Sequence, residues 1–226
     1  MTIYALSTGP GLSGLAVIRI SGSECKNVLK KLTGSNELTP RRATLKNINK
    51  IENNELIDRG IVLFFPSPES YTGEDMLEFH VHGSRAVIDS LLFEISKVAN
   101  CRLAEPGEFT KIAFQNAKID LLEAESISDL IASETEIQRR QALDIMSGNQ
   151  GKKYENWRKK LLMVLSNIEA KIDFPEEELP INILDETKKI SKDVCNEIKK
   201  VLDDQRVGER IREGFKIAIL GPANAG

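Results

Sequence analysis

The stretch Met76-Leu77-Glu78-Phe79-His80-Val81-His82 decides the fold of the first half of the chain. From position 77 onward its residues alternate with the period of two that is typical of a β-strand with one buried face. The odd-numbered positions are apolar and form one face, so Glu78, His80 and His82 share the other. We therefore expect a sheet whose polar face carries one carboxylate and two imidazoles.

Further short β-rich runs surround this stretch. They are Ile3 to Leu6, Leu15 to Ile20 and Gly60 to Phe65. Two helices are expected between the strands, at about Glu24 to Leu32 and at about Ser84 to Val98, with Ser84 as the N-cap of the second. The first part of the chain is therefore predicted to be a compact α+β domain.

The pattern becomes almost wholly helical from Pro106 onward. Pro106 opens a helix that runs to about Asn116. Apolar side chains at helical spacing predict three longer helices, around residues 121–131, 157–172 and 190–202. The segment from Asp173 to Pro180 contains two prolines and an acidic run, so it cannot continue a helix. We expect an all-α helical bundle here.

The last residues, Lys216-Ile217-Ala218-Ile219-Leu220-Gly221-Pro222-Ala223-Asn224-Ala225-Gly226, are interpreted as a buried strand and the glycine frame of a phosphate-binding loop. Gly221, Asn224, Ala225 and Gly226 would lie against nucleotide phosphates, and the Lys and Ser/Thr that complete such a loop do not follow. An ordinary strand and turn is the alternative. We expect a fragment of a nucleotide-binding protein that does not itself hydrolyse nucleotide.

Composition indicates a soluble protein without a membrane span. The 226 residues are 41% hydrophobic and 29% charged, and their length favours two modest domains over one large domain. The three cysteines form no C-x-x-C pair, which argues against a disulfide framework or a zinc cage and favours a reducing cytoplasm. A net charge of −3 gives no global attraction to nucleic acid.

Three charged residues are candidates for ligand binding. Arg19 interrupts the apolar strand Val17 to Ile20, so its guanidinium needs an anionic partner or solvent. Glu78 is either an exposed strand carboxylate or an acceptor for the N–H edge of a heterocycle, with Arg19 and Lys118 engaging acidic parts of the same ligand. The pair His80 and His82 can bind a metal, but no third histidine exists, so we favour no metal site.

Several motifs along the chain resemble those of one family. The chain contains, in this order, Thr8-Gly9-Pro10-Gly11, Val17-Ile18-Arg19-Ile20-Ser21-Gly22, Phe64-Phe65-Pro66-Ser67-Pro68, Tyr71-Thr72-Gly73-Glu74-Asp75, Pro106-Gly107-Glu108-Phe109-Thr110, Ala113-Phe114-Gln115-Asn116, Lys118-Ile119-Asp120-Leu121 and Ile172-Asp173-Phe174-Pro175-Glu176-Glu177-Glu178. With the closing Gly221 to Gly226, this series resembles the tRNA modification GTPases of the MnmE (TrmE) family across essentially the whole chain.

The resemblance implies three parts. Residues 1–118 would form a folate-binding domain related to the tetrahydrofolate domain of aminomethyltransferases, which also pairs two subunits. Residues 119–212 would form an incomplete helical domain. Residues 213–226 would begin a Ras-like GTPase domain, with its first strand near Phe215.

The resemblance also implies an activity for the full-length protein. Together with an FAD-containing partner, the family modifies C5 of the wobble uridine of tRNA, using a one-carbon tetrahydrofolate and potassium-stimulated, magnesium-dependent GTP hydrolysis. The folate is 5-formyl- or methylene-tetrahydrofolate, and its contacts would be Arg19, Glu78 and Lys118. Asn224 would be the potassium ligand. No catalytic residue is expected within these 226 residues.

Two other classes of protein are compatible with the first domain. One is a folate-dependent aminomethyltransferase, which would not be followed by a long helical segment and a phosphate loop. The other is a non-catalytic dimerisation scaffold that keeps the fold without binding folate.

Overall fold

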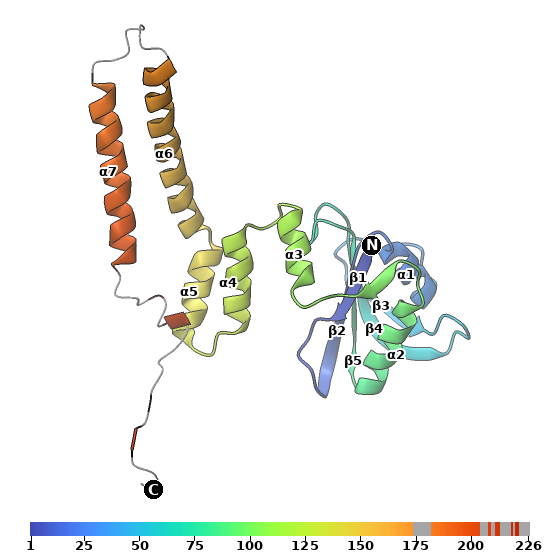
Figure 1. Ribbon diagram of the computed structural model, residues 1–226. Coiled ribbons are helices and arrows are strands. Elements are labelled where there is room, and N and C mark those ends of the chain that lie inside the picture. The colour runs from blue at the N-terminus through green and yellow to red at the C-terminus, as the bar shows by residue number, and fades with distance from the viewer. Residues whose placement is uncertain (174–181, 204–207, 209–210, 213–217, 219, 222–226) are drawn as a thin grey trace. The chain divides into compact units, whose positions relative to one another are not determined.

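The computed structural model describes residues 1–173, 182–203, 208, 211, 212, 218, 220 and 221. The chain divides into two compact units, Met1–Asp120 and Leu121–Gly226. Figure 1 shows the strands of the described residues in the first unit and long helices in the second. This mixed α+β architecture, a strand-rich part followed by a helical part, confirms the predicted fold class.

The first unit is built on a six-stranded sheet with the order β3-β4-β5-β2-β1-β6. Neighbouring strands are antiparallel except for β1 and β6, which are parallel. The strands are β1 (Thr2–Leu6), β2 (Ser13–Ser21), β3 (Thr44–Asn49), β4 (Leu56–Phe65), β5 (Met76–Gly83) and β6 (Cys101–Leu103). The helices of this unit are α1 (Cys25–Thr33), α2 (Arg85–Ser96) and α3 (Glu108–Gln115).

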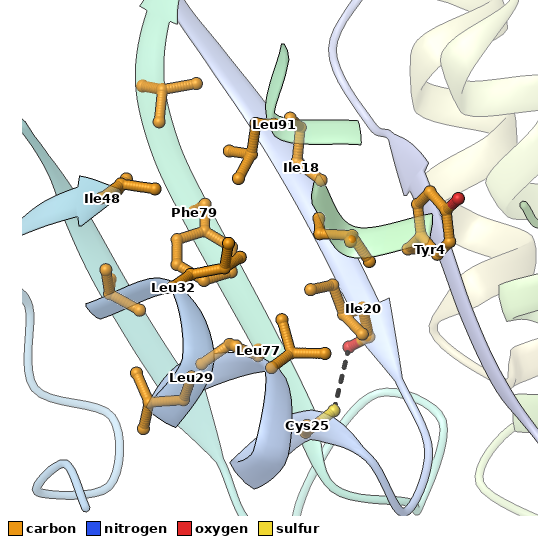
Figure 2. Packing of buried hydrophobic residues seen from close by; sticks show 14 of the residues in the cluster. Tyr4, Ile18, Ile20, Cys25, Leu29, Leu32, Ile48, Leu77, Phe79 and Leu91 are labelled. Carbon is orange, nitrogen blue, oxygen red and sulfur yellow. Dashed lines mark hydrogen bonds between the residues drawn. The ribbon is translucent and has the colours of Figure 1, made fainter. Parts of the chain in front are cut away.

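Helices α1 and α2 cover one face of this sheet and form the core with it. Phe79 and Leu77 of β5 are fully buried, and Leu29 of α1 and Leu91 of α2 pack in the same cluster (Figure 2). Ser84 caps α2, as its sequence position predicts, because its Oγ accepts a hydrogen bond from the backbone N–H of Val87 at 3.3 Å. The opposite face of the sheet carries Arg19 of β2 and Glu78 and His80 of β5, with Val17 and Ile61 beside His80.

The sequence patterns did not predict the strands β3 and β6. Strand β3 is an edge strand with mostly polar residues, and only Ile48 is buried in it, so it carries little hydrophobic alternation. Strand β6 has three residues, too few to show a period. Both are strands because they pair with neighbours that the pattern does predict, β4 and β1.

The second unit is helical. It contains α4 (Leu121–Ile131), α5 (Glu136–Met146), α6 (Asn149–Asp173) and α7 (Ile183–Leu202). The sequence patterns did not predict helix α5, which lies between the helices expected around residues 121–131 and 157–172. It begins at a capping box in which Thr135 and Gln138 exchange hydrogen bonds between side chain and backbone. None of the helices in the described part of the chain is long and apolar enough to span a membrane.

Helices α6 and α7 pack against each other and leave apolar side chains exposed. The indole N–H of Trp157 donates to Glu197 at 2.6 Å, and Lys160 forms an ion pair with the same carboxylate at 2.9 Å. The apolar residues that are exposed on this pair of helices include Met163 and Leu165. Residues 174–180 of the proline-containing acidic segment lie outside the described residues.

The buried strand expected at Phe215 to Leu220 is not confirmed. Of these residues the structure describes Ala218 and Leu220, neither in a strand, and Leu220 is 93% exposed. A strand needs neighbouring strands for its backbone hydrogen bonds, and the described residues of the second unit provide none.

Candidate functional site

Arg19 and Glu78 meet on the face of the sheet that α1 and α2 leave uncovered. The two residues are directly opposite each other in the antiparallel pair β2 and β5. Arg19 Nε lies 2.9 Å from Glu78 Oε1, and the side chains are 31% and 13% exposed. Of the two alternatives that the sequence leaves for Arg19, an anionic partner or solvent, the structure shows the first. The partner is Glu78, in a half-buried position where each charge stabilises the other.

Two aromatic rings flank the guanidinium of Arg19. Its central carbon lies 5.8 Å from the ring centroid of Tyr71 and 5.9 Å from that of Phe109, within the range of cation–π contacts. Tyr71 belongs to the loop between β4 and β5, and Phe109 belongs to α3. The Tyr71 hydroxyl and the hydroxyl of Thr110 are hydrogen bonded at 2.9 Å, which joins the loop to the helix. The charged pair is therefore bordered by flat apolar surfaces.

The loop that carries Tyr71 is fixed by buried and partly buried hydrogen bonds. Ser21 Oγ lies 2.7 Å from Thr72 Oγ1 and donates to Glu74 Oε2 at 2.8 Å. The side-chain amide of Asn116 donates to the carbonyl oxygen of Thr72 at 2.7 Å. Strand β2, the loop and the end of α3 are therefore connected, and the rings beside Arg19 are held in place.

Helix α3 is anchored at its first residue. Arg102 of β6 donates two hydrogen bonds to Glu108, at 2.9 and 2.5 Å, and the backbone N–H of Glu105 donates a third at 2.8 Å. The bonds from Arg102, and then the bond from Glu105, lower the pKa of the Glu108 carboxyl to about 2. This ion pair holds the helix that presents Phe109.

Lys118 is linked to this site through the loop and not by a direct contact with the charged pair. Gly73 has φ +79°, and a methyl group added there would come within 3.2 Å of Lys118 Cγ, so the lysine stem lies against this glycine. Among the described residues, no hydrogen bond or ion pair joins Lys118 to Arg19 or Glu78. Its side chain is exposed, which leaves the ammonium group available to a ligand.

His80 and His82 turn to two different carboxylates. His80 Nε2 lies 3.1 Å from Glu78 Oε2, so His80 belongs to the charged site. His82 Nδ1 lies 2.9 Å from Asp58 Oδ1. Burial favours a higher pKa for Asp58, but hydrogen bonds from the backbone and ring of His82 and from the backbone of Arg59 lower it overall. The described residues contain no group of three or more His, Cys, Asp or Glu suited to a metal ion.

The sequence patterns did not predict the two aromatic rings beside Arg19 or the contact between His80 and Glu78. A signal for His80 existed, because the period of two places it beside Glu78 on the same face. The predicted phosphate-binding residues Asn224, Ala225 and Gly226 lie outside the described residues, and Gly221 is described but exposed.

The second unit has a small cavity that cannot hold a folate. It measures about 50 Å³ and is lined by Asp129, Ala132, Ser133, Gln138, Gln141, Ala142 and Arg212. Ligand pockets for molecules of drug size measure about 300–1,000 Å³. This cavity has room for one or two water molecules, which would satisfy the buried Gln141 Oε1 that lacks a partner within the described residues.

Taken together, the first unit presents an acceptor and two cations beside flat rings. Glu78 can accept hydrogen bonds from N–H groups, and Arg19 and Lys118 can contact carbonyl or anionic oxygens. Such a set has the hydrogen-bonding groups and charges that could bind and orient a planar heterocycle with an acidic tail. Nothing in this geometry requires these residues to transfer protons.

Comparisons with known proteins agree with this division of the chain. The family described as "GTP-binding protein TrmE N-terminus" matches residues 2–118, and the family described as "MnmE helical domain" matches residues 121–216.

Curated relatives match over the full chain. One from Pelagibacter ubique (strain HTCC1062) is 66% identical over 226 residues, one from Parvibaculum lavamentivorans is 47% identical over 225, and one from Rickettsia prowazekii is 46% identical over 225. Each carries the name "tRNA modification GTPase MnmE", and the alignments cover 100% of this chain and 51% of each relative. The chain spans about half the length of these relatives. It therefore belongs to the MnmE (TrmE) family and contains the N-terminal and helical domains of that family.

Proposed function

We propose that residues 1–118 bind a one-carbon tetrahydrofolate, 5-formyl- or methylene-tetrahydrofolate, at Arg19, Glu78 and Lys118. The observation that carries this proposal is the contact between Arg19 and Glu78 at 2.9 Å, beside the rings of Tyr71 and Phe109. A folate has a flat pterin with donor and acceptor edges and an anionic glutamate tail, so its chemistry matches one carboxylate, two cations and aromatic surfaces.

Ligand binding would exchange one set of charged contacts for another. Without ligand, Arg19 and Glu78 satisfy each other in a half-buried position. A pterin would offer its N–H groups to Glu78 and a carbonyl oxygen to a cation, so that neither side chain loses a partner when the ligand enters. Lys118, held against Gly73 at the edge of the same loop, would contact the acidic part of the ligand. Bound there, the folate supplies the one-carbon group, and the protein supplies its orientation.

For the full-length protein we propose the activity in the name of its relatives. It would hydrolyse GTP and modify tRNA, as that name says. Beyond the name, we propose that the modified atom is C5 of the wobble uridine and that an FAD-containing protein is the partner. A GTPase domain would begin at residues 213–226, with magnesium bound at the completed phosphate loop and potassium bound by Asn224. The protein would act in the cytoplasm as a homodimer paired through its first domain. The 226 residues alone are expected to lack GTPase activity.

Calorimetric titration of the 226-residue chain with 5-formyltetrahydrofolate tests the folate site. Glu78→Gln keeps the shape of the side chain but removes its charge, and is expected to weaken binding about 10- to 100-fold, because a hydrogen bond to a charged group contributes about 1.5–3 kcal/mol. Lys118→Met should weaken binding by a smaller factor, since this side chain is exposed.

Lys111→Met is the matched control for Lys118→Met, because Lys111 is also exposed and lies on α3 outside the charged site. Its affinity should equal that of the unchanged chain. Absence of binding by the unchanged chain, together with a dimer in sedimentation experiments, would favour the non-catalytic scaffold instead. The aminomethyltransferase alternative is disfavoured by the match of residues 121–216 to the helical domain family.

A further inference from the structure

The Glu78 carboxylate is held at both of its oxygens. Oε1 lies 2.9 Å from Arg19 Nε, and Oε2 lies 3.1 Å from His80 Nε2. Arg19 comes from β2, whereas His80 comes from the same strand as Glu78, two positions along. The arginine is on a long flexible side chain, and the imidazole is on a short one with two rotatable bonds. Arg19 can therefore move away from Glu78 more easily than His80 can.

The surroundings of His80 leave Glu78 as its polar partner. The residues opposite His80 in the sheet are Val17 of β2 and Ile61 of β4, and both are apolar. Within the described part of the chain, the His80 ring is hydrogen bonded to the Glu78 carboxylate, and its side chain is 22% exposed. Because a carboxylate that is paired with arginine only accepts hydrogen bonds, the proton of a neutral His80 ring belongs on Nε2.

We propose that His80 is a positioning residue for ligand binding. By donating from Nε2 to Glu78 Oε2, it keeps the carboxylate oriented when Arg19 turns from Glu78 to the ligand. The free oxygen of Glu78 then faces the N–H groups of the ligand without a new side-chain rotation. This inference rests on the proposed folate site, and it assigns to that site a fourth residue that contacts Glu78 and not the ligand.

Two substitutions distinguish the effect of the hydrogen-bond donor of His80 from the effect of its ring. His80→Leu removes the donor and keeps an apolar side chain between Val17 and Ile61, and should weaken 5-formyltetrahydrofolate binding about tenfold. His80→Gln places an amide N–H donor at a similar distance from the backbone, so the affinity for 5-formyltetrahydrofolate should stay within about threefold of that of the unchanged chain. His82→Leu is the matched control, because this histidine lies on the same strand, contacts Asp58 and is 73% exposed, and should leave the affinity unchanged.

A spectroscopic measurement tests the positioning contact without any ligand. Long-range ¹H–¹⁵N NMR of the ring nitrogens should show His80 with its proton on Nε2 in the unchanged chain, and a mixture of tautomers in Glu78→Leu. A proton on Nδ1 would overturn the inference. So would equal folate affinities for the unchanged chain and His80→Leu, an outcome that leaves the folate site itself intact. Absence of folate binding by the unchanged chain would instead overturn the proposed function and, with it, the ligand part of this inference.

Discussion

Truncation of Phe79 to alanine tests the placement of strand β5, on which the candidate site depends. Phe79 is fully buried between the sheet and helices α1 and α2, next to Glu78 in sequence but on the other face. A phenylalanine buries about 150–250 Å². At about 25 cal/mol per Å², that area corresponds to about 4–6 kcal/mol. Because alanine keeps part of this burial and a cavity remains, the expected loss is about 3–5 kcal/mol.

The assay must distinguish the two units. Hydrogen exchange of the β2 and β5 amides in increasing urea follows the first unit, and the fluorescence of Trp157, the single tryptophan, follows the second. Phe79→Ala should lower the stability of the first unit and leave the Trp157 transition unchanged. Phe93→Ala is the matched control, because Phe93 is 61% exposed and contacts the ammonium group of Lys97, so it should cost less than about 1 kcal/mol.

Equal and small losses for the two variants would refute this reasoning. They would mean that Phe79 is not part of a packed core and that the two faces of β5 are assigned wrongly. A shift of one residue in a strand exchanges its faces, so Glu78 and His80 would then point into the core. The candidate site could not exist in that arrangement.

Three further perturbations have expected outcomes. Gly73→Ala should destabilise the first unit by about 1–2 kcal/mol in urea titrations, because φ is +79° at this position. Gly9→Ala is the control and should be neutral, because a Cβ added at Gly9 would have no atom within 4 Å. Glu108→Gln should lower the free energy of unfolding by about 1 kcal/mol at pH 7, a small value because the partner Arg102 is partly exposed. The difference between the two proteins should disappear as the pH falls from about 4.5 to 2, where Glu108 becomes protonated. A difference that is unchanged at pH 2 would contradict the ion pair between Arg102 and Glu108. Burial, and to a smaller extent the nearby Asp75, raises the pKa of the Cys25 thiol. At pH 7, Ellman's reagent should therefore react first with the exposed Cys195, and with Cys25 only after unfolding. Peptide mass spectrometry identifies which cysteine has reacted.

Much of the first unit could be predicted because its core strands show strong alternation. The apolar positions of β5 and the apolar run of β2 predicted both strands. They left Arg19 with an anionic partner or solvent, and Glu78 as an exposed carboxylate or a ligand contact. Arg19 and Glu78 are 59 positions apart in sequence, and their direct pairing depends on the register between β2 and β5, which no local pattern encodes. The edge strand β3 was missed for a related reason, since its exposed side chains show no clear period.

Other parts of the site depend on the tertiary structure alone. Tyr71 and Phe109 lie in a loop and a helix that are far apart in sequence, and they meet at Arg19 because hydrogen bonds connect that loop to α3. Lys118 was named as a ligand contact, and the structure places it against Gly73 without a direct contact to the charged pair. Long-range packing of this kind decides the geometry of a site, whereas periodicity decides only which face a side chain occupies.

Hydrogen exchange with and without 5-formyltetrahydrofolate tests the central claim most directly. The account predicts that the ligand slows exchange in β2, in β5, in the loop around Tyr71 and in α3, and that α6 and α7 exchange at unchanged rates. Unchanged exchange throughout the first unit at saturating ligand, or protection confined to α6 and α7, would contradict a folate site at Arg19 and Glu78.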